Sequence, residues 1–195
     1  MEQGLWLALQ QAKAIARAGD PLTEGTVTDL HRVIYAKCWP SQAGQYRMGE
    51  VDAFEPIADL PPHHSMVRQE MWAFGNELEA RTSPEPGSPA ESVRLGIWAH
   101  MELVRIHPFQ EGNGKTARLL MDVVLMRHVL GPKRGLILPS HMRDRYLDVV
   151  QDYRAGNPMT FEVLVADLLE LTLRREEALR YQARPGRQRR VLPLE

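Results

Sequence analysis

Two stretches with apolar residues at helical spacing flank one short polar segment, and this interruption is the strongest constraint on the fold. The segment spans residues 107–118 and reads HPFQEGNGKTAR; we call it the signature segment. The helix before it is expected to end at about Ile106, because Pro108 disfavours helical geometry at the preceding residue. Helical spacing resumes at Lys115 and predicts a second helix to Leu130. The sequence thus predicts a polar, glycine-containing loop between two apolar helices.

The residue types in this loop are those of a phosphate-handling site. Gly112, Asn113 and Gly114 can arrange backbone N–H groups in a concave turn. The turn falls at the expected start of a helix, where unbonded N–H groups and the helix dipole favour an anion. Lys115 and Arg118 are three residues apart and share one face of the first helical turn. Two cations there oppose the dipole unless an anion joins them, which predicts a polyphosphate ligand.

Two further side chains supply reactive groups. Glu111 offers a hard carboxylate oxygen that suits Mg²⁺, which takes one or two carboxylates together with substrate phosphates. His107 could accept a proton from an attacking hydroxyl near neutral pH. Together these groups predict transfer of a phosphorus group from a nucleotide. A P-loop is disfavoured, because G-x-x-x-x-G-K-[ST] needs glycine where Phe109 stands, and because a helix, not a strand, is expected before the segment.

The signature segment resembles the motif of the Fic family, H-P-F-x-[D/E]-G-N-G-R-x-x-R, and departs from it at Lys115, where the family usually has arginine. Residues 44–47, Gly-Gln-Tyr-Arg, resemble the family's G-x-[YF]-R segment. The resemblance covers about residues 23–170. It implies an all-α, Fic-type helical domain with a short β-hairpin flap at about residues 45–56. One domain is expected over residues 1–183, followed by a basic tail over 184–195.

The resemblance also implies a role for each residue of the loop. His107 would deprotonate a hydroxyl group, and Glu111 would hold the Mg²⁺ that bridges the α- and β-phosphates. Asn113 would contact the α-phosphate, and the backbone of Gly112 and Gly114 would form the anion hole.

The remaining nucleotide contacts involve cations and one aromatic residue. Lys115 would face the β-phosphate and Arg118 the γ-phosphate. Lysine is a point charge rather than a planar fork, so weaker nucleotide binding or slower turnover is expected. Tyr146 could stack on the nucleotide base, or could be a half-buried helix tyrosine. Arg154 falls where some relatives carry an asparagine near the nucleotide.

The activity that the resemblance implies is Mg²⁺-dependent transfer of AMP from ATP to a Tyr, Thr or Ser hydroxyl of a target protein, with pyrophosphate leaving. Other family members transfer UMP, phosphocholine or phosphate. The phosphate-transferring Doc type usually has lysine at the position of Gly114, which argues against that reaction here. Lys115 and Arg154 also leave open a catalytically weakened nucleotide-binding or protein-docking module.

Partners follow from the same resemblance. A target protein would dock at the flap by strand addition. Many family members carry an inhibitory motif, [S/T]-x-x-x-E-[G/N], of which this chain has only partial copies at Thr172–Glu176 and at Glu24-Gly25. A toxin-like module restrained by a separate small antitoxin, or an effector fragment, is therefore expected, with Glu176 as an alternative inhibitor. The last two helices could support a homodimer. His63 and His64 are expected to be exposed loop histidines without an acidic partner at ligand spacing.

Composition sets outer limits. The 195 residues suit one domain with a sizeable core. A net charge of −1 does not support nucleic-acid binding. No signal peptide and no apolar run of membrane length is evident, so no membrane association and a cytoplasmic location are expected, with delivery into a host cell left open.

Apolar spacing predicts further helices along the chain. The first has a stripe of Leu5, Leu9, Ala12 and Ala16. Others are expected at residues 26–36 with Thr23 as cap, at 65–81, from Pro89 with Ser88 as cap, at 140–155 and at 160–182.

Overall fold

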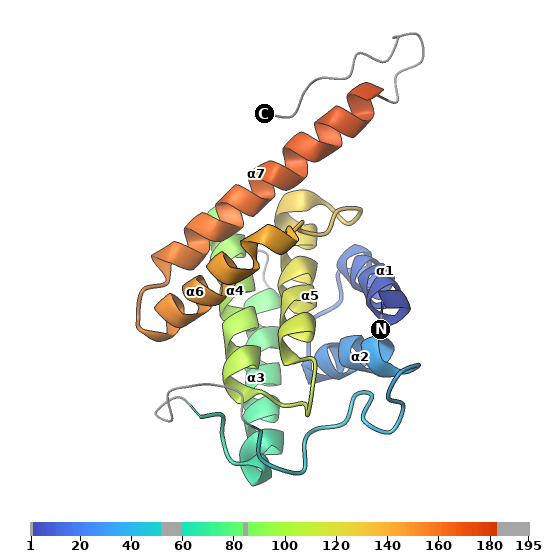
Figure 1. The fold of residues 1–195 in the computed structure, drawn as a ribbon, viewed down its shortest axis with the longest axis vertical. Coiled ribbons are helices and arrows are strands. Elements are labelled where there is room, and N and C mark those ends of the chain that lie inside the picture. Colours follow the sequence, from blue (N-terminus) through green and yellow to red (C-terminus); the bar gives the residue numbers. More distant parts are fainter. Residues whose placement is uncertain (1, 52–59, 84–85, 183–195) are drawn as a thin grey trace. The chain divides into compact units, whose positions relative to one another are not determined.

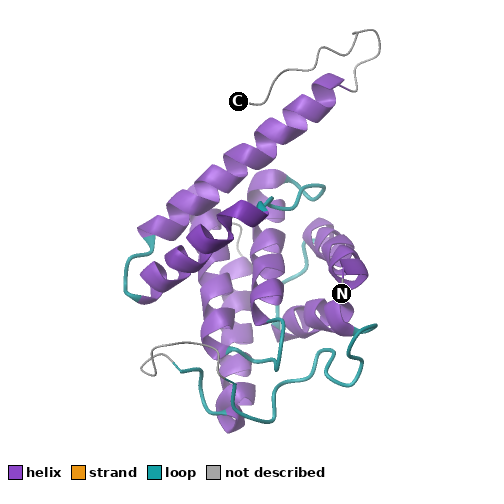
Figure 2. Ribbon diagram, in the orientation of Figure 1, coloured by secondary structure: helices purple, strands orange, loops and turns teal. Residues whose placement is uncertain are grey.

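The computed structural model describes residues 2–51, 60–83 and 86–182. All regular structure in these ranges is helical, as Figure 2 shows, which confirms the all-α prediction. Of the expected hairpin flap at 45–56, residues 45–51 form no strand, and residues 52–56 lie outside the described residues, so the hairpin stays a prediction. The basic tail over 184–195 also lies outside them.

The chain forms two compact units. The first, residues 1–135, contains α1 (Glu2–Ala18), α2 (Glu24–Tyr35), α3 (Val67–Thr82), α4 (Pro89–Ile106) and α5 (Asn113–Leu125). The second begins at residue 136 and contains α6 (Arg143–Arg154) and α7 (Met159–Gln182). Short helical turns add His64–Met66, Met126–Leu130 and Ser140–Met142. The expectation of one domain over 1–183 stays a prediction.

Helix α5 is the centre of the first unit. It packs along α4 and also against α1 and α2, and the signature segment joins α4 to α5 (Figure 1). The apolar residues along α5 and the turn after it are buried: Leu119, Leu120, Val123, Val124 and Met126. A helix that is apolar on nearly every face belongs inside a core, and each large side chain buried there contributes about 1.5–3 kcal/mol. The signature segment is thus anchored to the best-buried part of the molecule.

Helix α1 meets α2 through small residues rather than through leucines. The buried stripe of α1 is Gly4, Ala8, Ala12 and Ala16. The predicted stripe was therefore wrong at Leu5 and Leu9 and confirmed at its two alanines. A Cβ at Gly4 would lie 2.1 Å from the carbonyl oxygen of Ile34, so only glycine permits this approach. Periodicity alone does not distinguish a small-residue face from the leucine face beside it.

The helix ends follow the predicted capping. Ser88 caps α4 by accepting a hydrogen bond from the Glu91 N–H at 3.2 Å. Thr23 is the N-cap of α2. In the second unit, the Phe161 ring of α7 meets the edge of the Tyr146 ring of α6, with their centroids 6.2 Å apart. None of the helices in the described ranges has the length and apolarity needed to span a membrane.

Candidate active site

The backbone of His107 is in an unusual conformation. Helix α4 ends at Ile106, and His107 takes φ 49° and ψ 57°, the left-handed region. Within the described residues it is the one non-glycine position with positive φ. Such a conformation costs about 1–3 kcal/mol and persists only where the surroundings impose it, which is common at functional sites. The left-handed turn directs the chain out of α4 and into the loop.

The imidazole of His107 is held in one orientation. Its Nδ1 lies 3.3 Å from the carbonyl oxygen of Val104, and since a carbonyl only accepts, Nδ1 carries the hydrogen in that bond. The tautomer that makes this bond has its lone pair on Nε2. Burial lowers the pKa of His107; the nearby Arg47 lowers it further, against the raising effects of the Val104 carbonyl and of Glu111. His107 is therefore neutral at pH 7, as a general base must be.

Asn113 fixes the shape of the loop from inside. Its side-chain oxygen accepts from the Phe109 N–H at 2.9 Å, and its Nδ2 donates to the Phe109 carbonyl at 2.8 Å. The side chain is buried. The Asn113 side chain thus bonds to both the N–H and the carbonyl of Phe109, as a neighbouring strand does in a β-sheet, and these two hydrogen bonds close the loop. Asn113 thus has a structural role in addition to the α-phosphate contact, which stays a prediction.

Gly112 is required on two grounds. It is the N-cap of α5 with φ 85°, a conformation that side chains rarely adopt. A Cβ there would also lie 2.4 Å from Cε2 of Tyr35 and 2.6 Å from its hydroxyl oxygen. The tyrosine ring is buried against this turn. The first N–H groups of α5 follow at once, without partners within the helix.

His31 of α2 supports the loop through hydrogen bonds and ring stacking. Its Nδ1 accepts from the Gly44 N–H at 2.9 Å, so its Nε2 carries the hydrogen and donates to the Glu111 carbonyl at 3.0 Å. Its ring stacks on Phe109, with centroids 3.7 Å apart and planes 4° apart, and on Tyr35 at 4.7 Å. Burial lowers the pKa of His31 to about 4, so the ring stays neutral and keeps this tautomer near pH 7.

Arg47 braces the other side of the loop. Its Nε donates to the His107 carbonyl at 2.8 Å, its Nη1 to the Gly49 carbonyl at 3.1 Å, and its Nη2 to the Pro62 carbonyl. Its own backbone N–H donates to the Pro108 carbonyl at 2.8 Å. The residue is 2% exposed. A buried guanidinium that satisfies three carbonyls fixes the strained His107 backbone against the connector between α2 and α3.

The charged residues of the signature segment are Glu111 in the loop and Lys115 and Arg118 on α5. Glu111 is exposed, and its Oε1 is 3.9 Å from Nζ of Lys115. A Cβ at Gly114 would be 3.5 Å from Nη1 of Arg118, so the guanidinium lies over the first turn of α5. Complete burial and the nearby Arg118 lower the pKa of His100 to about 3. His100 is therefore a neutral core residue.

Tyr146 belongs to the second unit. Its ring is buried, and it packs edge-on against Phe161, which agrees with the helix-tyrosine alternative. Arg154 is the last residue of α6. Stacking of Tyr146 on a nucleotide base stays a prediction, as do the phosphate contacts of the loop residues.

Local sequence patterns did not predict that His31 and Arg47 support the loop. His31 lies 80 residues before Glu111, and Arg47 lies 60 residues before His107. The only available signal for Arg47 was its place in the G-x-[YF]-R segment. For His31, the signal was a histidine between apolar helix positions.

Known proteins resemble this chain in sequence and in fold. Protein adenylyltransferase Fic from Drosophila persimilis is 29% identical to this chain over 170 residues, which are 87% of this chain and 32% of that protein. The solved structure of Fic-1 from C. elegans is 25% identical, with a TM-score of 0.71, over 90% of this chain and 49% of that chain. A Fic-domain-containing signaling protein from Bacteroides thetaiotaomicron shares the fold at 21% identity, with a TM-score of 0.68, over 86% of this chain and 67% of that one.

This chain thus spans about a third of the length of the curated relatives it matches, 32% for the Drosophila persimilis protein. The family model described as Fic/DOC matches residues 21–125, which include α2 to α5 and the whole signature segment. Since this match covers more than half of the sequence, the chain belongs to the Fic/DOC family.

Proposed function

We propose that this chain is a Mg²⁺-dependent protein adenylyltransferase that moves AMP from ATP to a tyrosine, threonine or serine hydroxyl of a target protein. One observation supports this most: the Nδ1 of His107 is turned to the Val104 carbonyl, which leaves the lone pair on Nε2, and His107 begins the loop that leads into the N-terminus of α5. A base next to an anion-binding helix terminus suits attack of a hydroxyl on a phosphate. Curated relatives carry the name protein adenylyltransferase Fic.

In this reaction, Nε2 of His107 takes the hydroxyl proton while the hydroxyl oxygen attacks the α-phosphorus. A new phosphorus–oxygen bond forms to the target side chain. The bond between the α-phosphorus and the oxygen that bridges to the β-phosphorus breaks, and pyrophosphate leaves with the bonding electrons. The proton on His107 then passes to solvent.

The rest of the signature segment binds the nucleotide. Backbone N–H groups of Gly112 to Gly114 and the helix dipole hold the α-phosphate region. Lys115 and Arg118, on the first two turns of α5, hold the β- and γ-phosphates. Asn113 contributes to the α-phosphate contact with the Nδ2 hydrogen that the Phe109 carbonyl does not take.

Mg²⁺ fits the residues present. Glu111 is an exposed carboxylate at the mouth of the loop, and one carboxylate with phosphate oxygens and water is an ordinary Mg²⁺ ligand set. When bound, Mg²⁺ neutralises charge on the phosphates. Glu111 and the phosphates of ATP would hold it together, and the 3.9 Å contact to Lys115 is loose enough to be exchanged for the metal.

The two glutamates of the partial inhibitory motifs, Glu176 and Glu24, contact residues outside the signature segment, which favours inhibition by a separate protein. Glu176 pairs with Arg180 of its own helix at 2.8 Å, and Glu24 accepts the Tyr46 hydroxyl at 2.5 Å. We therefore keep the proposal of a toxin-like, cytoplasmic module with a separate antitoxin. A target protein docked near residues 45–56 and a homodimer belong to the same proposal, and delivery into a host cell stays open.

The experiment uses ATP labelled at the α or the γ position, with Mg²⁺ and cell lysate, and compares wild type with His107→Ala. His141→Ala is the matched control, because His141 is an exposed histidine of the second unit. AMP transfer predicts protein label from the α position only, absent in His107→Ala and retained in His141→Ala. Label from the γ position would instead mean phosphate transfer. Nucleotide binding without label from either ATP, or from α-labelled UTP, would favour the binding module.

A further inference from the structure

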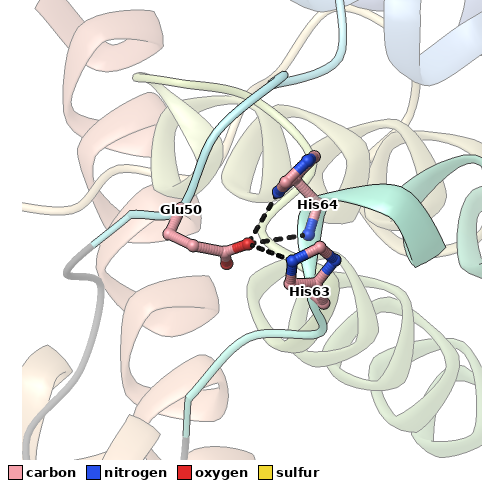
Figure 3. A group of neighbouring side chains, drawn as sticks. All are labelled: Glu50, His63 and His64. Atoms are coloured by element: carbon pink, nitrogen blue, oxygen red, sulfur yellow. Dashed lines mark hydrogen bonds and ion pairs between the residues drawn. The ribbon is translucent and has the colours of Figure 1, made fainter.

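Three metal-ligating side chains gather beside the Arg47 brace, outside the proposed active site. They are Glu50, His63 and His64, and their ligand atoms all lie within 4.8 Å of one another. Figure 3 shows one carboxylate oxygen of Glu50 facing both imidazoles. That oxygen, Oε1, is 3.2 Å from Nε2 of His63 and 2.7 Å from Nδ1 of His64. No local spacing pattern indicates this group, because Glu50 precedes His63 by 13 residues and His64 by 14.

The arrangement matches the needs of a zinc ion. Zinc binds imidazole nitrogen and carboxylate oxygen at about 2.0–2.2 Å in tetrahedral sites, which places ligand atoms roughly 3.4 Å apart. The observed separations of 3.2 and 2.7 Å need only small side-chain shifts. Two imidazoles favour zinc over the hard ions Mg²⁺ and Ca²⁺. His63 and Glu50 are well exposed, so the ion has an open path and room for water as a fourth ligand.

Neighbouring groups orient the ligands. Nδ1 of His63 accepts from the Ser65 N–H at 3.3 Å and lies 2.8 Å from Oγ of Ser65, so in this arrangement Nε2 carries the hydrogen and faces Oε1 of Glu50. Binding of an ion at Nε2 would move this hydrogen to Nδ1, where Oγ of Ser65 can accept it. The backbone N–H of His64 donates to Oε1 of Glu50 at 3.2 Å. Nη1 of Arg47 is 3.5 Å from the other carboxylate oxygen, Oε2, which leaves Oε1 for the ion. These contacts preset the ligand geometry.

We propose that Glu50, His63 and His64 form a zinc site that ties the two ends of the segment 51–62 together. The ion would join residue 50 to residues 63 and 64, next to the Gly49 and Pro62 carbonyls that Arg47 already holds. The site is separate from the Mg²⁺ ligand Glu111. It therefore stands or falls independently of the adenylyltransferase proposal.

The test titrates tag-free, metal-stripped protein with Zn²⁺ by calorimetry and with Co²⁺ by visible absorption, which reports tetrahedral coordination. Wild type is expected to bind one equivalent, and excess Mg²⁺ is expected not to displace it. His63→Ala, His64→Ala and Glu50→Gln are each expected to weaken binding more than about tenfold, and Ser65→Ala by about tenfold. His141→Ala and His107→Ala are the matched controls and are expected to bind as wild type does.

Circular dichroism of each variant verifies that it is folded, and the exposed His63→Ala keeps the test valid if Glu50→Gln unfolds. Absence of Zn²⁺ binding to wild type would overturn the proposal. So would binding that survives both His63→Ala and His64→Ala, or binding lost in His107→Ala but kept in His63→Ala.

Discussion

The signature segment and its braces are built in opposite ways. The segment carries the base, the carboxylate and the cations within twelve consecutive residues, 107–118. The braces, His31 and Arg47, come from a distant part of the chain. Neither has a role in the proposed reaction. Their polar atoms bond instead to backbone carbonyls of the segment, those of Glu111 and His107.

The signature segment supplies the reactive groups, whereas His31 and Arg47 hold the segment in its conformation. The segment alone could not hold His107 in a left-handed conformation, which costs free energy. Arg47 bonds to the carbonyl of that same residue and to two carbonyls of the connector, so it supplies the constraint that the strain requires. The local motif thus needs long-range contacts to adopt the geometry of a site. Substitutions in the signature segment should therefore reduce activity, whereas substitutions of His31 or Arg47 should reduce stability as well.

The largest effect is expected from removing the base. His107→Ala should reduce AMP transfer by about 10²–10⁴-fold, the usual contribution of a general base, while ATP affinity is unchanged. Label incorporation and calorimetric ATP titration measure the two quantities. Transfer at the wild-type rate in the folded variant would remove His107 from the mechanism.

Removing the Arg47 brace should damage stability and activity together. Arg47→Met leaves three carbonyls without their donor, and each buried group so exposed costs about 1–3 kcal/mol. We expect a loss of at least about 3 kcal/mol in urea unfolding, with transfer reduced as well. Arg47→Lys keeps the charge but not the planar fork, so it should be intermediate. Wild-type stability in Arg47→Met would show that the loop supports itself.

A pair of glycines gives a matched test of loop geometry. Gly112→Ala should destabilise the protein by roughly 2 kcal/mol or more, because of its φ of 85° and the 2.4 Å approach to Tyr35. Gly114→Ala meets only an ordinary 3.5 Å contact with Arg118 and should be neutral or stabilising by up to about 1 kcal/mol. Thermal unfolding of both variants measures the two changes in stability. Equal changes would contradict the difference in geometry between the two glycines.

The smallest effect concerns the departure from the family motif. Lys115→Arg should strengthen ATP binding or turnover by about threefold to tenfold, the value of one added hydrogen bond of ~0.5–1.5 kcal/mol. Arg118→Lys is the reciprocal change and should weaken binding. ATP affinity and steady-state transfer measure both. A loss of ATP affinity or turnover in Lys115→Arg would mean that the site needs a lysine, not only a positive charge, at this position.

Local features were predictable from the sequence, and long-range ones were not. Pro108 and the caps Thr23 and Ser88 located helix ends, and contiguous residues revealed the candidate base and cations. The burial face of α1 was misplaced, because close approach at Gly4 depends on the Ile34 carbonyl of another helix. Contacts between residues far apart in the chain leave no spacing pattern in a single sequence.

The histidines at 63 and 64 show the same limit. His63 is exposed, as expected, but the acidic partner that the sequence did not reveal is supplied by Glu50 across the segment 51–62. Likewise, nothing in the local sequence around His31 indicated that its two ring nitrogens would bridge Gly44 and Glu111.

A ¹⁵N NMR titration of the His107 imidazole, assigned with His107→Ala, tests most directly whether His107 is a preset base. We expect the tautomer with hydrogen on Nδ1 and a pKa below the usual 6.5, because burial disfavours the charged form. A lowered pKa in the folded state also means that His107 contributes a loss of stability as the pH falls below 6.5, where the unfolded chain takes up the proton first. Hydrogen on Nε2 near pH 7, or a pKa above 6.5, would contradict the assignment of His107 as a preset base.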